Sequence, residues 1–216
     1  MVLEIGDSLG NDLGWGLARQ LGATRGLTLV QRDKSSSGLS NSWFYDWPTR
    51  LAGYLAQYHP NLVVVCLGAN DQQGMRVNGS GVQFNTPAWR VAYAEQIHRV
   101  VSLATRAGSY VLWVGLPVMG PNGYRQGTAV LNTLYAKVAS AVPGVAYLPS
   151  WNVFATANGA YRAAARVNGV LSVLRQPDGI HFTLVGENVF STFLTYQLRT
   201  IYHVALLPAA PVAITG

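Results

Sequence analysis

Two short segments of the chain carry residue types that together can perform nucleophilic catalysis. Gly6-Asp7-Ser8-Leu9-Gly10 places a serine at the start of a predicted helix, where unpaired backbone N–H groups stabilise negative charge. Asp178-Gly179-Ile180-His181 places a histidine three residues after an aspartate, so the carboxylate can orient the imidazole. A serine hydroxyl needs such a base to attack a carbonyl carbon. Taken singly, Ser8 could equally be a helix cap, and Asp178 and His181 a surface pair.

Two further segments could supply hydrogen-bond donors to a reacting carbonyl. Gly68-Ala69-Asn70-Asp71 directly follows an apolar run, and the Asn70 amide can donate to a developing oxyanion, although Asn-Asp turns are also common after strands. Ser36-Ser37-Gly38-Leu39 contains a glycine whose backbone can approach a substrate and donate its N–H. In open parallel sheets, ligands bind beyond the carboxyl ends of the strands. We therefore expect the four segments to meet at one edge of a sheet.

The elements that would position these segments alternate between strand and helix. Apolar, β-branched runs predict strands at about 2–5, 27–31, 62–67, 110–116 and 145–148. Helical patterns fall at about 9–21, 47–58, 86–106, 128–141 and 183–203. Strands separated by helices imply a parallel sheet covered on both faces, which accounts for continuous apolar runs. The predicted fold is a three-layer α/β/α sandwich with a five-stranded parallel sheet.

Three segments fall outside this alternation. Asn168-Gly169 lies between β-compatible flanks, which predicts a β-hairpin within 160–175 with a type I′ turn. Residues 75–87 are rich in Gly, Asn and Ser and are predicted to form a surface loop. We expect a single domain over 1–203, followed by an irregular tail over 204–216.

Composition narrows the classes of protein to which the chain can belong. The length of 216 residues fits one domain with a sizeable core. The formal charge is +6, but the 15 Lys and Arg residues are scattered rather than clustered, which argues against a nucleic-acid binder. The single cysteine, Cys66, lies in an apolar run and is expected to be a core residue without a disulfide. No apolar stretch reaches the roughly 18 residues that a membrane span requires.

The location of the protein in the cell is a separate expectation. Val2-Leu3-Glu4-Ile5 already has the pattern of a core strand, and natural chains seldom begin inside their first core strand. Only 11% of the residues are charged, and the polar residues are largely uncharged. We therefore expect an export or anchor segment upstream of Met1 and an extracellular or periplasmic location.

The four segments together resemble the conserved blocks of the SGNH, or GDSL, hydrolase family. The residues that give the family its name match Ser8, Gly38, Asn70 and His181, in the same order along the chain. The resemblance implies a flavodoxin-like fold and ester hydrolysis through an acyl-enzyme on Ser8, with no metal and no cofactor. It also implies an oxyanion hole formed by the backbone N–H groups of Ser8 and Gly38 and the Asn70 side chain.

One part of the chain resembles a narrower group within the family. The segment Lys34-Ser35-Ser36-Ser37-Gly38-Leu39, together with Asp46-Trp47-Pro48, is similar to a bacterial cell-envelope subgroup of the family. The first block also matches G-x-S-x-G, the nucleophile elbow of α/β-hydrolases. That elbow follows a central strand deep in the chain, whereas Ser8 follows the first strand, so the SGNH assignment is favoured.

The sequence thus predicts a serine esterase with Ser8, Asp178 and His181 as its catalytic residues. We favour a short acyl or acetyl ester, carried on a small molecule or a carbohydrate, as its substrate. The candidate substrate-binding residues are Trp47, Trp89, Tyr124 and Arg125. An acyltransferase that uses the same triad on a glycan, and a non-catalytic glycan-binding domain, are the alternatives. The sequence does not decide the oligomeric state.

Overall fold

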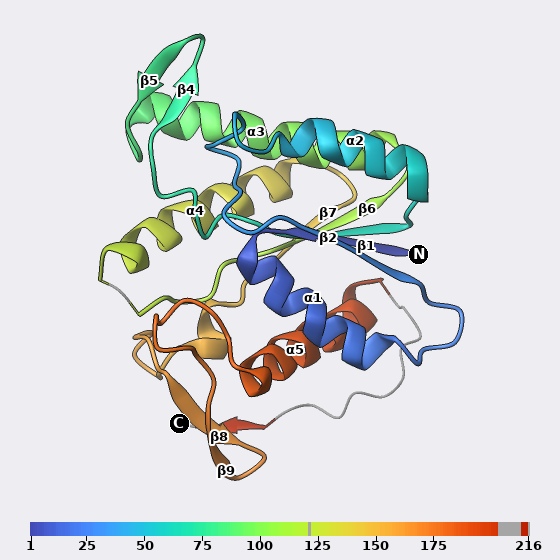
Figure 1. Cartoon of the computed structure of the whole chain (residues 1–216), viewed down its shortest axis with the longest axis vertical. Coiled ribbons are helices and arrows are strands. Elements are labelled where there is room, and N and C mark those ends of the chain that lie inside the picture. The colour runs from blue at the N-terminus through green and yellow to red at the C-terminus, as the bar shows by residue number, and fades with distance from the viewer. Residues whose placement is uncertain (121, 203–212, 216) are drawn as a thin grey trace.

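A five-stranded parallel sheet forms the centre of the molecule. The computed structural model describes residues 1–120, 122–202 and 213–215. The strands lie in the order β2-β1-β3-β6-β7, and every neighbouring pair is parallel (Figure 1). This is the flavodoxin-like order, in which the chain reverses its direction of winding between β1 and β3. The bounds are β1 (Val2–Gly6), β2 (Leu29–Asp33), β3 (Leu62–Cys66), β6 (Tyr110–Val114) and β7 (Val145–Leu148).

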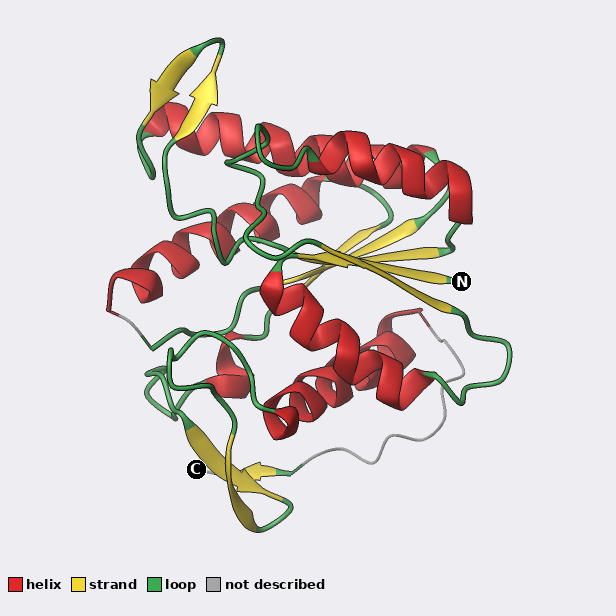
Figure 2. Cartoon of the chain, viewed as in Figure 1, coloured by secondary structure: helices red, strands yellow, loops and turns green. Residues whose placement is uncertain are grey.

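Helices cover both faces of the sheet and complete three layers, which confirms the predicted fold class (Figure 2). One face carries α1 (Ser8–Leu21) and α5 (Leu184–Tyr202). The other carries α2 (Trp47–Tyr58), α3 (Pro87–Arg106) and α4 (Asn122–Ala141). All five residues of β3 are buried, as expected for a central strand covered on both sides. A short 3-10 helix, η1 (Trp151–Phe154), follows β7.

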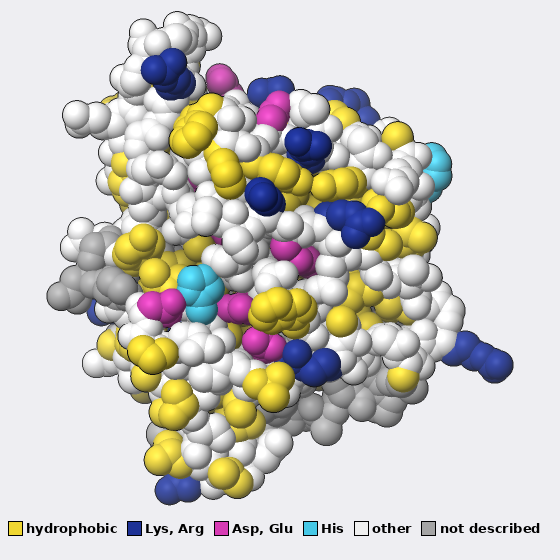
Figure 3. All heavy atoms as spheres, viewed as in Figure 1, with side chains coloured by type: hydrophobic (Ala, Val, Ile, Leu, Met, Phe, Trp, Pro, Cys, Tyr) yellow, Lys and Arg dark blue, Asp and Glu magenta, His cyan; other side chains and the backbone are white. Residues whose placement is uncertain are grey.

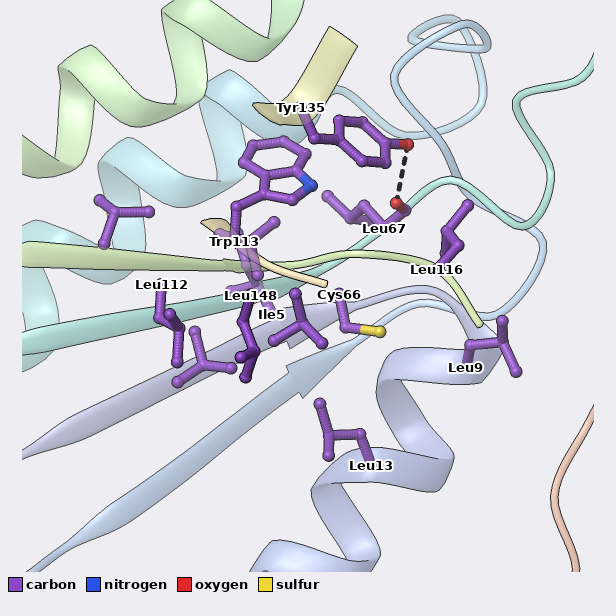
Figure 4. Close-up of a cluster of buried hydrophobic side chains, with 14 of the residues drawn as sticks. Ile5, Leu9, Leu13, Cys66, Leu67, Leu112, Trp113, Leu116, Tyr135 and Leu148 are labelled. Carbon is purple, nitrogen blue, oxygen red and sulfur yellow. Dashed lines mark hydrogen bonds between the residues drawn. The ribbon is translucent and has the colours of Figure 1, made fainter. Parts of the chain in front are cut away.

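The core lies between the sheet and these helices. Figure 4 shows part of it, where Trp113 of β6 packs with Tyr135 of α4 above the central strands. The Tyr135 hydroxyl donates a hydrogen bond of 3.0 Å to the carbonyl oxygen of Leu67, so this large polar side chain is satisfied inside the core. Cys66 is fully buried, as predicted, and burial raises the pKa of its thiol. A buried, protonated thiol is a poor nucleophile.

The helices α1 and α5 pack closely on each other. A Cβ atom on Gly16 would lie 2.5 Å from the carbonyl oxygen of Glu187, so only glycine permits this approach. Arg19 pairs with the Glu187 carboxylate, and the Asp12 carboxylate accepts the backbone N–H of Phe182 at 2.9 Å. These contacts fix the beginning of the chain against its last long helix.

The hairpin predicted within 160–175 is present. Strands β8 (Ala164–Val167) and β9 (Val170–Val173) are antiparallel. The turn residues Asn168 and Gly169 have φ angles of 50° and 84°, as a type I′ turn requires. The tail differs in part from its prediction, because β10 (Ile214–Thr215) pairs with β8 rather than being irregular. Residues 204–212 and 216 of the predicted tail lie outside the described residues.

Two other predictions about elements were wrong. The predicted loop at 75–87 contains a second hairpin, formed by β4 (Met75–Val77) and β5 (Ser80–Val82), with Asn78 and Gly79 in its turn. Helix α4 begins at Asn122 instead of residue 128. Its first turns include Gly127, which weakens the helical signal in the sequence. The structure needs a small residue there, because a Cβ atom would lie 2.1 Å from the Gln72 side chain.

Candidate active site

Ser8, His181 and Asp178 form a continuous hydrogen-bonded chain at the surface. The His181 Nε2 atom lies 2.8 Å from the Ser8 Oγ, and its Nδ1 atom lies 2.7 Å from Asp178 Oδ2. Figure 3 views a face on which a histidine side chain is exposed with acidic side chains beside it. The structure therefore brings the first and last sequence blocks together. With a proton on Nδ1, the Nε2 atom is free to accept the serine proton.

The Asp178 turn orients this imidazole locally. The backbone N–H groups of Ile180 and His181 donate to Asp178 Oδ1 at 2.8 and 3.0 Å, which leaves Oδ2 for the imidazole. Gly179 has a φ of 70°, which the tight turn requires and glycine adopts readily. Burial alone would raise the pKa of Asp178, but the hydrogen bonds from His181 and from the two backbone groups lower it below its ordinary value. Asp178 therefore stays a carboxylate in mildly acidic solution.

Asp7 ties the serine block to the block that contains Asn70. It precedes α1, and its side chain accepts the backbone N–H of Leu9 at 2.9 Å, which caps the helix. Its other oxygen accepts the N–H groups of Gly68 and Ala69 at 2.9 and 2.8 Å. Burial raises the pKa of Asp7 to about 7, against these three donors, which favour the carboxylate. The ends of β1 and β3 are thus joined directly beside Ser8.

Asp71 holds the segment that contains Gly38 in the same way. Its buried carboxylate accepts the backbone N–H of Leu39 at 2.9 Å, the N–H of Ser40 at 2.8 Å and the Tyr93 hydroxyl at 2.7 Å. A Cβ atom on Gly38 would lie 2.1 Å from Asp71 Oδ1, so the close approach requires glycine. Burial raises the pKa of Asp71, while these hydrogen bonds lower it.

The Asn70 side chain is held with one amide hydrogen to spare. Its Nδ2 atom donates to the carbonyl oxygen of Ser37 at 3.0 Å, which links this block to the segment before Gly38. Within the described part of the chain, no acceptor takes the backbone N–H of Gly38. The N–H of Ser8 lies at the start of α1, where helical N–H groups lack intrahelical partners. These donors follow β1, β2 and β3 and remain available for a negatively charged oxygen.

Two of the four predicted substrate-binding residues do not face solvent. Trp47 and Trp89 are fully buried, so the prediction that they contact substrate is wrong. The indole N–H of Trp47 donates to the Ser37 hydroxyl at 3.0 Å, and that of Trp89 donates to the carbonyl of Gln73 at 2.9 Å. Both therefore support the loops around the site from beneath.

The other two predicted substrate residues, Tyr124 and Arg125, are exposed. They lie in the first turns of α4. The Arg125 guanidinium donates to the carbonyl oxygen of Gly159 at 3.1 Å, which links this end of α4 to the segment after η1. Their contact with substrate stays a prediction.

The sequence did not predict the roles of Asp7 and Asp71. Each is an acid next to a predicted site residue, yet it faces inward and links two loops through backbone N–H groups. Their adjacency to Ser8 and Asn70 was the only signal in the sequence. Over the residues that the structure describes, no group of three or more His, Cys, Asp or Glu could hold a metal ion. Over the same residues, no helix is long and apolar enough to cross a membrane.

One known protein family matches nearly the whole chain. The family described as "Protein of unknown function (DUF459)" matches residues 1–197. The chain belongs to the DUF459 family. A search of the curated proteins finds no match to this DUF459 chain.

Solved structures share the fold of this DUF459 protein at low sequence identity. Esterase EstA from Pseudoalteromonas sp. superposes with a TM-score of 0.63 at 13% identity, covering 94% of this chain and 98% of its own. TesA gives 0.62 at 20% identity, with 92% and 98% covered. A GDSL-like lipase from Bacteroides thetaiotaomicron gives 0.59 at 16% identity, with 94% and 88% covered. The resemblance to SGNH hydrolases predicted from the four blocks is therefore confirmed in the fold.

Proposed function

We propose that this DUF459 protein is a serine esterase that acts through Ser8, His181 and Asp178. The observation that carries the proposal is the unbroken chain of hydrogen bonds from Ser8 Oγ through the imidazole to the Asp178 carboxylate, at 2.8 and 2.7 Å. A glycan-binding domain would have no use for this alignment of a hydroxyl, a base and a carboxylate. The fold shared with an esterase and a GDSL-like lipase supports the same reaction class.

The proposed reaction has two half-cycles. In the first, Ser8 Oγ attacks the ester carbonyl while its proton passes to His181 Nε2, and the resulting imidazolium is stabilised by Asp178. The alcohol then leaves with that proton, and Ser8 carries the acyl group. In the second half-cycle, water loses a proton to the same nitrogen and attacks the acyl-enzyme. The bond from the acyl carbon to Ser8 Oγ then breaks, His181 returns the proton to Ser8, and the acid is released.

The negative charge of each tetrahedral intermediate would rest on donors that three loops supply. The N–H groups of Ser8 and Gly38 and the Asn70 amide are the proposed oxyanion hole. Asp7 and Asp71 fix the loops before any substrate arrives, so the donors need not reorganise during the reaction. One such preorganised donor is worth roughly 3–4 kcal/mol of transition-state stabilisation in hydrolases.

For the substrate, we propose a short acyl ester on a carbohydrate. A cavity of about 470 Å³ opens between the loop after β2 and the β4–β5 hairpin, and Ser40 of the Gly38 segment forms part of its wall. Its lining mixes the aromatic rings of Trp43 and Phe84 with the charged side chain of Arg76. Trp43 is 80% exposed, and an exposed aromatic face beside polar groups suits a sugar ring better than an acyl chain.

Labelling with a fluorophosphonate probe tests the catalytic assignment. The Ser8 oxygen would displace fluoride from phosphorus while His181 takes the proton. We expect the wild type and a Ser140→Ala control to be labelled, because Ser140 is an exposed serine on α4 that bonds only within its own helix. Ser8→Ala should remain unlabelled and inactive, with an unchanged circular dichroism spectrum. Labelling of Ser8→Ala at the wild-type rate would refute the assignment.

A panel of 4-nitrophenyl esters with rising acyl length tests the substrate proposal. We expect kcat/KM to be highest for acetate or butyrate and to fall with each longer chain. Acetylated sugars should be deacetylated faster than nitrophenyl esters of long acids. A clear preference for long acyl chains would overturn the short-acyl proposal and leave the esterase assignment intact.

A further inference from the structure

Cationic side chains lie over aromatic rings where the edge strand β2 faces α2. Lys34, directly after β2, has its Nζ atom 5.5 Å from the ring centre of Phe44. The guanidinium carbon of Arg50 in α2 lies 5.2 Å from the ring centre of Tyr45. Figure 3 shows Lys and Arg side chains among hydrophobic ones over β2 and α2, on the face that also carries a histidine beside acidic side chains. Phe44 and Tyr45 are neighbours in the chain, so the two cations lie on adjacent residues.

Arg32 extends this group along β2. Its guanidinium carbon lies 4.9 Å from the ring centre of Tyr58 and 5.9 Å from that of Tyr54. The Tyr54 hydroxyl lies 2.9 Å from the Tyr45 hydroxyl, which connects Arg32 to the ring beneath Arg50. We use the name cationic patch for Arg32, Lys34 and Arg50. The charges of the patch are spread over several rings rather than directed into one pocket.

Nearby carboxylates do not neutralise the cationic patch. Among the described residues, none of its three members forms an ion pair. Asp33 follows Arg32 on β2 but points to the opposite side, where its Oδ1 atom lies 3.2 Å from the position that a Cβ atom on Gly10 of α1 would occupy. Asp46 is partly buried, and its carboxylate accepts the Thr49 hydroxyl at 2.5 Å. The patch therefore keeps its positive charge at the surface.

Most acidic side chains of the protein lie away from solvent, whereas the cations of the patch face it. Of the nine Asp and Glu residues, only Glu95 and Asp178 are exposed, and neither lies on β2 or α2. Lys34 and Arg50 are exposed, and their side chains donate no hydrogen bond within the part of the chain that the structure describes. Exposed cations that are grouped and unpaired create a local positive potential, which attracts an anionic ligand from solution.

The cationic patch continues into the loop that leads to the proposed oxyanion hole. The carbonyl oxygen of Lys34 accepts the Ser37 hydroxyl at 2.6 Å, one residue before Gly38. The ring centres of Phe44 and Trp43 lie 6.1 Å apart, and Trp43 lines the cavity of about 470 Å³ beside the same loop. A long ligand that lies on the patch could therefore extend over Phe44 and Trp43 toward this cavity.

We propose that the cationic patch binds an acidic polysaccharide, whose repeated carboxylates pair with Arg32, Lys34 and Arg50. Charges that are spread over several rings match a repeated anion better than a single one. A guanidinium that lies on an aromatic ring keeps its edge N–H groups for a carboxylate, with which it can pair in a planar fork. That this polysaccharide also carries the ester to be cleaved rests on the proposed esterase function.

A nucleic acid fits the same surface less well. Single-stranded nucleic acids bind by stacking their bases on open aromatic faces beside a basic groove. In the cationic patch, the side chains of Arg32, Lys34 and Arg50 themselves lie over the aromatic faces. Sugar units need no stacked position at each ring, so the carboxylates of a polysaccharide can meet the cations where they are.

Two oligosaccharides of equal length test this surface. One is a hexamer of galacturonate, and the other is the same hexamer with every carboxylate converted to a neutral methyl ester. We would titrate each into the Ser8→Ala variant by calorimetry, so that no ester is hydrolysed during the measurement. The charged hexamer should bind with a Kd at or below about 1 mM and at least about tenfold more tightly than the neutral one. A single-stranded DNA hexamer of thymidylate should bind more weakly than the charged oligosaccharide.

Two double variants separate the cationic patch from the general attraction of anions to a basic protein. Lys34→Gln with Arg50→Gln removes two charges from the patch. Arg25→Gln with Arg166→Gln is the matched control, because it removes the same charge from the loop before β2 and from the β8–β9 hairpin. All four positions are exposed, and circular dichroism would check that both proteins are folded. Affinity for the charged hexamer should fall at least about tenfold in the first variant and stay within about twofold in the control.

The outcomes distinguish this proposal from the esterase proposal. Equal binding of the charged and neutral hexamers, no measurable binding of the charged one, or an equal loss in both double variants would overturn the polysaccharide surface, even if a fluorophosphonate labels Ser8. Binding of the DNA hexamer as tight as that of the oligosaccharide would overturn it in favour of a nucleic-acid surface. Selective, patch-dependent binding in a protein that is never labelled would keep the polysaccharide surface and remove the esterase function.

Discussion

Replacing Gly38 with alanine tests whether a single methyl group can disable the proposed oxyanion hole. The added Cβ atom would lie 2.1 Å from Asp71 Oδ1, whereas an ordinary contact begins at 3.4 Å. The carboxylate or the loop must therefore move by about 1.3 Å, the difference between the two distances. Gly38 does not have a left-handed backbone, so conformational strain adds nothing to the cost. The effect comes from the displaced carboxylate alone.

The size of the effect follows from the bonds of Asp71. Its hydrogen bonds to the N–H groups of Leu39 and Ser40 are 2.9 and 2.8 Å long, and a shift of this size breaks both. A hydrogen bond to a charged group contributes about 1.5–3 kcal/mol, so Gly38→Ala should lower the free energy of unfolding by about 3–6 kcal/mol. The N–H of residue 38 moves with the loop, and loss of one oxyanion donor should lower kcat about 100-fold.

Urea unfolding and hydrolysis of 4-nitrophenyl acetate measure the two quantities. Gly53→Ala is the matched control, because Gly53 is an exposed residue inside α2 with no atom near its missing Cβ. That substitution should raise the free energy of unfolding by about 0.5–1 kcal/mol and leave kcat unchanged. If the free energy of unfolding of Gly38→Ala lies within about 0.5 kcal/mol of the wild-type value and kcat is retained, the close packing of Gly38 on Asp71 neither stabilises the fold nor positions an oxyanion donor.

Three further predictions concern the triad, a buried acid and the core. Asp178→Asn should lower kcat roughly 10³–10⁴-fold without unfolding the protein, because the amide stabilises the tautomer in which His181 Nε2 carries a proton toward Ser8; a loss below tenfold would contradict this. Burial raises the pKa of Asp33 from 3.8 to about 6, so Asp33 stays protonated to a higher pH in the folded state than in the unfolded state. The free energy of unfolding should therefore fall as the pH rises from about 4 to about 6. Melting curves at several pH values would show it, Asp33→Asn should flatten the slope, and a rise in stability across the same window would be inconsistent. Tyr135→Phe leaves a buried carbonyl unpaired and should cost about 1–3 kcal/mol in urea unfolding, and a neutral result would rule out that role.

The sequence predicted the sheet and its helices because their signals are local. The apolar run at 62–67 and the amphipathic stretch at 47–58 each carry the pattern that predicts their secondary structure. Strand β7 and helix α2 have the predicted bounds. The two hairpins show where local patterns no longer suffice. Both have Asn-Gly in the turn, but β4 and β5 contain only three residues each, too few for an alternating pattern to distinguish them from a Gly-rich loop.

Some site residues could likewise be predicted from local patterns and others could not. Ser8, Asp178 and His181 could be chosen because the spacing of Asp178 and His181 is local and the chemistry of a serine nucleophile demands both. Burial could not be inferred for Trp47 or Trp89, since an aromatic ring near the site is equally suited to cover a ligand or to support a loop. The inward direction of Asp7 and Asp71 depends on contacts between different loops, which spacing along the chain does not record.

Because α1 packs on α5, the reactivity of Ser8 also reports whether these two helices remain in contact. The histidine and its aspartate share one turn and can be prepared locally, whereas the serine arrives from the other end of the sequence on a different helix. Gly16 determines how closely the two helices meet, and Asp12 binds the backbone of Phe182 just before α5 begins. The rate at which a fluorophosphonate labels Ser8 therefore measures whether this pair of helices is still packed together. During gentle denaturation, that rate should collapse when the pair separates, before the helical dichroism of the whole molecule fades.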